Sequence, residues 1–501
     1  MKQAVVNGLE SYVATTTRMI IFLKRLLLLA SILSVEFLDL SDNSIEGALP
    51  RTEFANFSRL VHLDLSKNEL TGAITQELFK LTSLRYLAFY GDSLQGRLPA
   101  EIGNFTNLRA LTLGNNKIGG KITLEIGNLR KMKTLVLSNN NITGGIPGSM
   151  QKLSKLEILQ VDHNQLSGPI PKYMKNLSLG GNKLTWNGHG MKFVPKSILS
   201  RLSLSSCNIS GSIPSWLSNQ TGLYFLDLSD NRLEGNLPVW LAKINITIMF
   251  LSDNKLKGSL PPEMFQNSRL SVLDLSRNNF HGELPKSVGE ARSSRILMLA
   301  DNSFAGRVPP SALNNTNMLL LDLSKNSLPV RGDIPSSLGR IHDPDQQDDE
   351  TFFGVFDQKV GNLLRHCQCE NLLVNWKKSE QILNSQQVEL YSLIDLSNNY
   401  LSGQIPPILG NLTDLISLNL SCNTLSGEIP GTLGDLKNLE ILDLSHNDLS
   451  APAPPPSTFE RPEPGNDEQY FSWTFAGIGY PIGLILTVGF AYTIGLFNDT
   501  Q

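Results

Sequence analysis

One short pattern, Leu-x-x-Leu-x-Leu-x-x-Asn-x-Leu, recurs along most of the chain and constrains the fold more than any other feature. Most steps between successive Asn positions are 24 residues, whereas one is 18 and one is 73. A fixed period of this length predicts a stack of near-identical units rather than several independent globular domains. The Asn position, sometimes Asp or Cys, is occupied by Asn43, Asn68, Asp92, Asn116, Asn140, Asn164, Asn182, Cys207, Asn231, Asn254, Asn278, Asn302, Asn326, Asn399, Asn423 and Asn447.

Each residue type in the pattern has a physical role. Leu38 and Leu40 alternate with Asp39 and Ser41, which predicts a short strand with leucines inward and polar residues outward. One such strand cannot bury its leucines alone, so neighbouring units must stack to form a continuous core. The repeating Asn is predicted to be buried, where its amide satisfies backbone groups of adjacent turns. Asp92 or Cys207 should make fewer of these hydrogen bonds.

The period and pattern are those of leucine-rich repeats. The predicted fold is therefore an α/β-type leucine-rich-repeat solenoid of about 16 repeats, with short parallel strands on its concave face. A Gly-x-Ile-Pro element, as at 211–214 and 403–406, supplies a bend followed by an extended segment.

Composition narrows the function. The net charge of -3 gives no electrostatic reason to expect nucleic acid. Four Cys in 501 residues are too few for a disulfide scaffold. No nucleophile–base pair, phosphate-binding loop or metal cluster is visible, so we predict neither an enzyme nor a cofactor.

The predicted organisation follows from where the repeat holds and where it fails. Residues 1–37 allow two interpretations: a signal-like segment, because basic residues precede the apolar run Leu26 to Leu33, or a degraded first repeat. The remaining parts are repeats at 38–340, an island insert at 341–392, last repeats at 393–450, a Pro-rich acidic linker at 451–470, a transmembrane helix at 471–497 and a tail at 498–501.

Strand residues that alternate with the leucines should face outward on the concave side. Tyr86 and Tyr90 alternate with Leu87 and Phe89, and aromatic side chains of this kind anchor ligands. Ordinary solvated strand positions are the alternative, because aromatic residues are favoured in strands anyway. The other candidates for a ligand-binding surface are Gln160, Asp162, His163, Arg201, Phe225, Phe250, Arg277 and Met298.

The island insert should form a loop on one face of the stack. Long inserts of this kind are usually functional or disordered. His366, Cys367 and Cys369 suggest a metal site, but no second ligand pair follows at a suitable spacing, which favours ordinary thiols.

Residues 471–497 carry no charge and are long enough to cross a bilayer. Gly479 and Gly483 form a Gly-x-x-x-Gly pattern that lets another helix approach closely. Asn-x-Ser/Thr sequons favour an extracellular, glycosylated repeat region and hence a type I orientation. These sequons are at Asn56, Asn104, Asn141, Asn176, Asn208, Asn219, Asn245, Asn314, Asn411 and Asn419.

The repeats at 393–415 and 418–439 resemble the plant extracellular leucine-rich repeat. Their order, with an island before the last repeats, an acidic juxtamembrane segment, one span and a minimal tail, resembles plant receptor-like proteins, the kinase-lacking relatives of leucine-rich-repeat receptor kinases. The resemblance implies a plasma-membrane receptor for an extracellular peptide, protein or glycan ligand, acting in defence or development.

The resemblance also implies partners and their contact residues. Gly479 and Gly483 would pair with the transmembrane helix of an adaptor receptor kinase. Trp376, Lys377 and Lys378 would meet the ligand or a short co-receptor kinase. The juxtamembrane contact would use the acidic residues Glu463, Asp467 and Glu468.

The chain departs from that family pattern because the Cys-paired caps on either side of the repeats are not visible. Two alternative functions stay open, the first because such modules use the same repeats and the second because of the missing caps. One is a recognition module such as an inhibitor of wall-degrading enzymes, and the other is a truncated, non-functional receptor copy.

Overall fold

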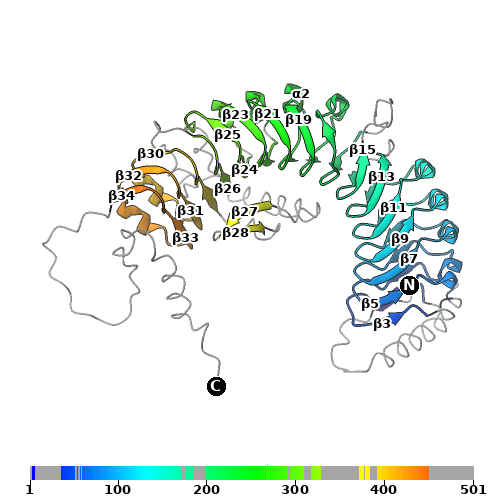
Figure 1. The fold of residues 1–501 in the computed structure, drawn as a ribbon. Helices are drawn as coiled ribbons and strands as arrows, with labels where there is room; N and C mark the ends of the chain where they lie inside the picture. Colours follow the sequence, from blue (N-terminus) through cyan, green and yellow to red (C-terminus); the bar gives the residue numbers. More distant parts are fainter. Residues whose placement is uncertain are drawn as a thin grey trace, which may run out of the picture. The chain divides into compact units, whose positions relative to one another are not determined.

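The structure, a computed structural model, divides into two compact units, residues 1–255 and 256–501. Both are stacks of parallel-stranded repeats (Figure 1), so the prediction of a leucine-rich-repeat solenoid is confirmed. The described residues are 3–5, 35–50, 54, 57, 59–170, 176–185, 198–267, 269–290, 294–309, 318–328, 372–376, 379–383 and 392–450.

The first unit is built on a parallel sheet to which each repeat contributes one three-residue strand. Adjacent strands pair in equivalent register, with Leu38 opposite Leu63 and Leu63 opposite Leu87. These leucines are at most 1% exposed, as the inward pattern predicts. The strands are β2 (Phe37–Asp39), β4 (His62–Asp64), β6 (Tyr86–Ala88), β8 (Ala110–Thr112), β10 (Thr134–Val136), β12 (Ile158–Gln160), β14 (Asn176–Ser178), β16 (Arg201–Ser203), β18 (Phe225–Asp227) and β20 (Ile248–Phe250).

A short strand, β1 (Gln3–Val5), pairs in parallel with β2 and places Ala4 opposite Leu38. It occupies the place that the strand of a preceding repeat would have. The apolar run at 26–33, on which the alternative of a signal-like segment rests, lies outside the described residues.

A second set of parallel strands, which the repeat pattern did not predict, follows the Asn turns. Gly235 has φ +90°, a conformation that glycine adopts readily, and it lies in such a strand shortly before Pro238. In the first unit these strands are β3 (Glu46–Ala48), β5 (Glu69–Gly72), β7 (Ser93–Arg97), β9 (Lys117–Lys121), β11 (Asn141–Gly144), β13 (Gln165–Pro169), β15 (Lys183–Thr185), β17 (Ser210–Gly211) and β19 (Arg232–Asn236).

Short helices complete most repeats. They are mainly 3-10 helices of five residues, and several begin directly after a proline in an extended conformation. In the first unit they are η2 (Gln76–Lys80), η3 (Ala100–Asn104), η4 (Leu124–Asn128), η5 (Gly148–Lys152), η6 (Ser215–Asn219) and the α-helix α2 (Val239–Ala242).

The second unit repeats this plan. Its elements are β21 (Lys255–Gly258, beginning at the last residue of the first unit), η7 (Pro262–Gln266), β22 (Val272–Asp274), β23 (Asn279–Glu283), η8 (Lys286–Glu290), β24 (Ile296–Met298), β25 (Ser303–Ala305), β26 (Leu320–Asp322), β29 (Leu393–Asp395), β30 (Ser402–Gly403), η11 (Pro407–Asn411), β31 (Ser417–Asn419), β32 (Thr424–Glu428), η12 (Gly431–Asp435), β33 (Ile441–Asp443) and β34 (Asp448–Ser450).

Neither irregular step breaks the stack. Across the 73-residue step, β26 pairs directly with β29 and places Leu321 opposite Ile394. Between them in sequence, β27 (Leu372–Trp376) and β28 (Ser379–Leu383) form an antiparallel hairpin. At the 18-residue step, β14 still pairs with both β12 and β16, so the deletion shortens only the connection between strands.

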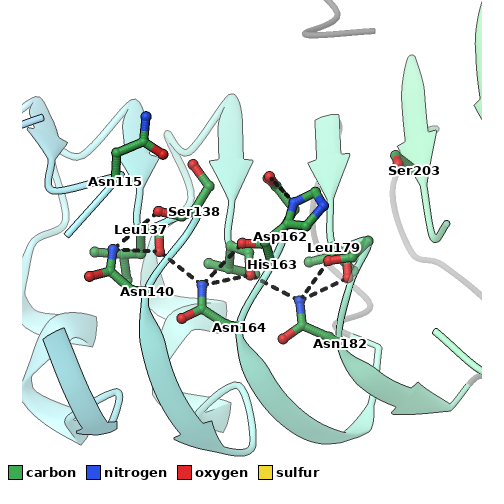
Figure 2. Close-up of polar contacts among 12 residues, drawn as sticks. Asn115, Leu137, Ser138, Asn140, Asp162, His163, Asn164, Leu179, Asn182 and Ser203 are labelled. Carbon is green, nitrogen blue, oxygen red and sulfur yellow. Dashed lines mark hydrogen bonds and ion pairs between the residues drawn. The ribbon is translucent and has the colours of Figure 1, made fainter. Parts of the chain in front are cut away.

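The repeating asparagines form a ladder of hydrogen bonds through the stack (Figure 2). Asn164 Nδ2 donates to the carbonyl oxygens of Leu137, Val161 and Asp162 at 2.9, 3.1 and 3.1 Å. Asn164 Oδ1 accepts the N–H of Ile142 at 2.9 Å. Each amide therefore joins its own turn to the preceding repeat, which confirms the predicted role.

The two positions where Asp92 or Cys207 replaces the ladder Asn make fewer side-chain hydrogen bonds, as predicted. Asp92 Oδ1 accepts the N–H groups of Asn68 and Leu70, but Asp92 Oδ2 is buried without a hydrogen-bond partner. Burial raises the pKa of Asp92 to about 6. The Cys207 thiol donates to the Leu179 carbonyl oxygen at a longer distance of 3.4 Å, and burial raises its pKa to about 11.

Candidate functional site

The concave strand surface of the first unit is open to a ligand. From β2 to β16, the first residue of every strand is half-buried or exposed, while the middle residue is buried. Hydrogen bonds to both neighbouring strands fix each backbone, so these side chains stand on a rigid surface.

Three aromatic rings stack at this surface. The ring centroids of Phe37 and His62 are 3.9 Å apart and those of His62 and Tyr86 are 4.2 Å apart, with interplanar angles of 13° and 2°. Tyr86 was predicted from the sequence, whereas Phe37 and His62 were missed. The strand register could have found them, because all three residues precede the middle leucine of their strands.

Carboxylates occupy the neighbouring column on two of these strands, β2 and β4. Tyr86 Oη donates to Asp64 Oδ2 at 3.3 Å, and Asp39 occupies the matching position on β2. Burial, with the nearby Asp64, raises the pKa of Tyr86 to about 12. Burial also lowers the pKa of His62 although both carboxylates act to raise it, so the imidazole is neutral at pH 7 and this column is acidic.

Tyr90 was predicted to lie on the strand, but β6 ends at Ala88, so that prediction is wrong. Tyr90 lies in the turn that follows, half-buried, and its Oη accepts a hydrogen bond from Asn115 Nδ2 at 2.7 Å. A Cβ atom at Gly114 would lie 3.0 Å from the Tyr90 ring, so the absence of a side chain there makes room for it.

Asp162, His163 and Arg277 also follow their strands rather than lying in them, and Figure 2 shows the first two. His163 and Arg277 have φ of 51° and 52° in the left-handed turn before the ladder Asn, which corrects the prediction that Arg277 is a strand residue. His163 Nδ1 lies 3.2 Å from Asp162 Oδ2, and Asp162 is buried. Gln160 ends β12 and is half-buried.

The structure brings three predicted residues together near the end of the first unit. The Arg201 guanidinium carbon lies 4.2 Å from the centre of the Phe225 ring, and Phe250 packs edge-on against Phe225 at 6.0 Å. Phe225 and Phe250 are nevertheless only 1% and 8% exposed. Met298 in the second unit is fully buried. The expectation that these three hydrophobic residues are exposed is therefore wrong, in part because Arg201 and Phe250 cover Phe225.

The predicted glycosylation sites differ in their exposure to solvent. Of the sequons, Asn104, Asn141, Asn208, Asn219, Asn245 and Asn411 are exposed. Asn176 and Asn419 are half-buried on strands, and Asn419 donates to Asp395 Oδ2. Trp376 ends β27. The predicted residues outside the described part are Asn56, Asn314, Lys377, Lys378, Glu463, Asp467, Glu468, Gly479 and Gly483.

Within the described residues, no helix is both long and apolar enough to cross a membrane. The predicted transmembrane segment at 471–497 lies outside that part of the chain.

Family patterns agree with the geometry. The leucine-rich repeat region pattern matches residues 38–178, and leucine-rich repeat patterns match 199–220, 222–244, 269–291 and 390–449. The chain is a leucine-rich-repeat protein.

Its relatives confirm the resemblance to plant receptor-like proteins. This leucine-rich-repeat protein is 41% identical over 96 residues to Receptor-like protein 45 of Arabidopsis thaliana, which is 19% of this chain and 10% of that relative. It is 35% identical over 98 residues to Receptor-like protein 9b of the same organism, again 19% and 10%. The matched region thus spans about a tenth of the length of these relatives.

Solved ectodomains share the fold over more of the chain. The ectodomain of the Arabidopsis thaliana membrane receptor kinase GASSHO1/SCHENGEN3, in complex with CASPARIAN STRIP INTEGRITY FACTOR 2, aligns with a TM-score of 0.65 and 28% identity, over 84% of this chain and 51% of that chain. The plant peptide hormone receptor RGFR1, in complex with RGF2, gives 0.63 and 29%, over 83% and 63%.

Proposed function

We propose that this protein is a kinase-lacking cell-surface receptor that senses an extracellular ligand, in defence or development. The observation that carries the proposal is the open concave strand surface of the first unit, where stacked strands hold aromatic and acidic side chains half-exposed. Two structural neighbours are receptors in complex with a named factor or hormone, which supports ligand recognition as the role of such repeats. We therefore propose that the repeats of this protein bind a ligand rather than catalyse a reaction.

The ligand is proposed to be a peptide, a protein or a glycan. In the first unit it would contact Tyr86 and Gln160 on the strands and Tyr90 and His163 in the turns that follow. The Trp376 to Lys378 stretch is proposed to contact the ligand or a short co-receptor kinase.

Signalling is proposed to pass through partner receptor kinases. We assign residues 471–497 to a single plasma-membrane span with the repeats outside, where the exposed sequons such as Asn104 and Asn411 would carry glycans. Gly479 and Gly483 would pair with the helix of an adaptor receptor kinase, with Glu463, Asp467 and Glu468 contacting it beside the membrane.

Affinity purification of the full-length protein from plant membranes, with and without candidate elicitors, tests this proposal. We expect an adaptor receptor kinase in both samples and a second kinase only with the active elicitor. Gly479→Leu with Gly483→Leu should reduce recovery of the adaptor, whereas Gly489→Leu, in the same segment but outside the pattern, should not. A freely secreted product would favour the wall-enzyme inhibitor, and retention in the endoplasmic reticulum with rapid degradation would favour a non-functional copy.

A further inference from the structure

The stack of three rings ends at Tyr86 without a fourth ring. The next strand places Ala110 directly opposite Tyr86, and Thr134 follows on β10. Adjacent strands lie about 4.8 Å apart, so a planar group could stack on Tyr86 at the same spacing as His62 does. The short side chains of Ala110 and Thr134 leave room for it, which makes the second face of Tyr86 a shelf for a flat ligand group.

The charges beside this shelf are negative. Asp64 Oδ1 accepts the N–H of Ser66 and its Oδ2 accepts from Tyr86 Oη, so the carboxylate is held next to the ring. Asp39 lies one strand further from the shelf, on β2, and adds negative charge at longer range.

The other titratable groups near the shelf do not neutralise these carboxylates. Arg85 and Arg109 immediately precede β6 and β8, at the strand ends opposite the carboxylates, and both are exposed. Three residues of strand, about 10 Å, separate such positions. His62 remains neutral because burial lowers its pKa.

We propose that the free face of Tyr86, beside the carboxylate of Asp64, forms a subsite for the guanidinium group of an arginine in a peptide ligand. The inference rests on the proposed receptor function and names one chemical feature of its ligand. A guanidinium is planar, always charged and able to donate to a carboxylate while it stacks on an aromatic ring. A lysine ammonium has the charge without the plane, and a neutral sugar ring would leave the two carboxylates without a cation.

Fluorescence anisotropy on the full-length protein in detergent tests the subsite. The probe is labelled acetyl-Gly-Arg-Gly-Arg-Gly-amide, compared with peptides in which lysine or citrulline, the neutral isostere, replaces both arginines. We expect the arginine peptide to bind about tenfold more tightly than the citrulline peptide and less tightly as salt rises. The lysine peptide should lie between them.

Variants separate the ring from the charge. Tyr86→Leu and Asp64→Asn should each weaken arginine-peptide binding about fivefold. Tyr86→Phe, which keeps the ring face, should stay within about twofold of the unsubstituted protein. Tyr400→Leu, at an exposed tyrosine in the second unit, is the matched control and should have no effect. Thermal unfolding of each variant checks that the repeats remain folded.

Equal binding of the arginine and citrulline peptides would overturn the subsite, as would unchanged affinity in a folded Tyr86→Leu variant. Competition by a neutral glucan hexamer that depends on Tyr86 but not on Asp64 would assign the shelf to a sugar instead. Arginine selectivity without any kinase in the membrane purification would uphold the subsite and refute the receptor role. Recovery of the kinases without arginine selectivity would uphold the receptor role and refute the subsite.

Discussion

Asn399 Nδ2 donates to the carbonyl oxygen of Leu323 at 3.0 Å, although 76 residues separate them. The equivalent bond in an uninterrupted step, from Asn326 to Leu299, spans 27 residues at the same distance. Asn399 Oδ1 also accepts the N–H of Leu328, at 3.3 Å. The repeats on either side of the insert therefore meet through the same amide contacts as the uninterrupted pair joined by Asn326.

Replacing Asn399 should accordingly be as harmful as replacing an ordinary ladder residue. Asn399→Ala leaves the buried carbonyl of Leu323 and the N–H of Leu328 without partners and should cost about 2–3 kcal/mol of unfolding free energy. Urea denaturation measures this cost. Asn302→Ala, in an uninterrupted step, provides the matched comparison, and a cost at Asn399 below half of that at Asn302 would contradict an intact junction.

Restoring Asn at position 92, where Asp makes fewer hydrogen bonds, should stabilise the first unit. Asp92→Asn keeps the acceptor for Leu70 and supplies an Nδ2 donor where Oδ2 now has no partner. The pKa of Asp92 is raised from 3.8 to about 6, so the folded state binds the proton more tightly than the unfolded state. The unsubstituted protein should therefore lose stability as pH rises from about 4 to 6.

The Asp92→Asn variant should lack that loss and be about 1–2 kcal/mol more stable than the unsubstituted protein at pH 7. Denaturation curves at pH 4, 5, 6 and 7 check both statements. Equal stability of the two proteins at pH 7 would show that the buried carboxylate finds another partner.

A second pH effect is expected at the junction of the insert. Asp322 and Asp395 are directly opposite each other on β26 and β29, and Asp274 also acts on Asp322. Burial, with the neighbouring carboxylates, raises the pKa of Asp322 to about 7, and burial also raises that of Asp395. Because both values lie above those of an unfolded chain, stability should fall as pH rises from about 4 through 7.

Asp322→Asn should remove one of the two opposed charges and raise the thermal midpoint of the second unit at pH 7.5 by at least about 2 °C, with little change at pH 4. Scanning calorimetry at the two pH values measures the difference. Asp448→Asn, at an exposed position on β34, serves as the control. A midpoint that does not depend on pH in the unsubstituted protein would contradict this assignment.

Helices η11 and η12 approach each other so closely that Gly410 leaves no room for a side chain. A Cβ at Gly410 in η11 would lie 2.2 Å from the backbone oxygen of Thr432, and backbone cannot move aside as a flexible side chain does. Gly410→Ala should cost about 1–3 kcal/mol through overpacking. A Cβ at Gly431, in η12, meets nothing within 4 Å, so Gly431→Ala should be neutral or slightly stabilising in the same urea titration.

The repeats can be predicted from the sequence because the interactions that form them depend on residue type and spacing within the pattern. The inward leucines of β2 and the hydrogen bonds of Asn164 follow from residue type and period alone. Even the junction at Asn399 could be predicted, because the pattern resumes there with its phase intact.

Prediction fails where a side chain depends on neighbours in other repeats. The sequence marks Phe225 as outward-facing but cannot show that Arg201 and Phe250, each about one repeat away, cover it. The pairing of His62 with Tyr86 has the same origin, since it appears only when the strands are placed in register. Alternation also runs past the true strand end at Ala88, which is why Tyr90 was placed on the strand.

The direction of the Asn ladder has a consequence for synthesis on the ribosome. The N–H of Leu70 donates to Asp92, 22 residues later. This hydrogen bond cannot form until the following repeat has been synthesised. At typical translation rates that delay is about 1–4 s. Leu328 waits for Asn399, 71 residues later, which extends the delay to about 4–14 s. During that interval the nascent chain presents an unfinished edge, and a chaperone would have its longest opportunity to bind there.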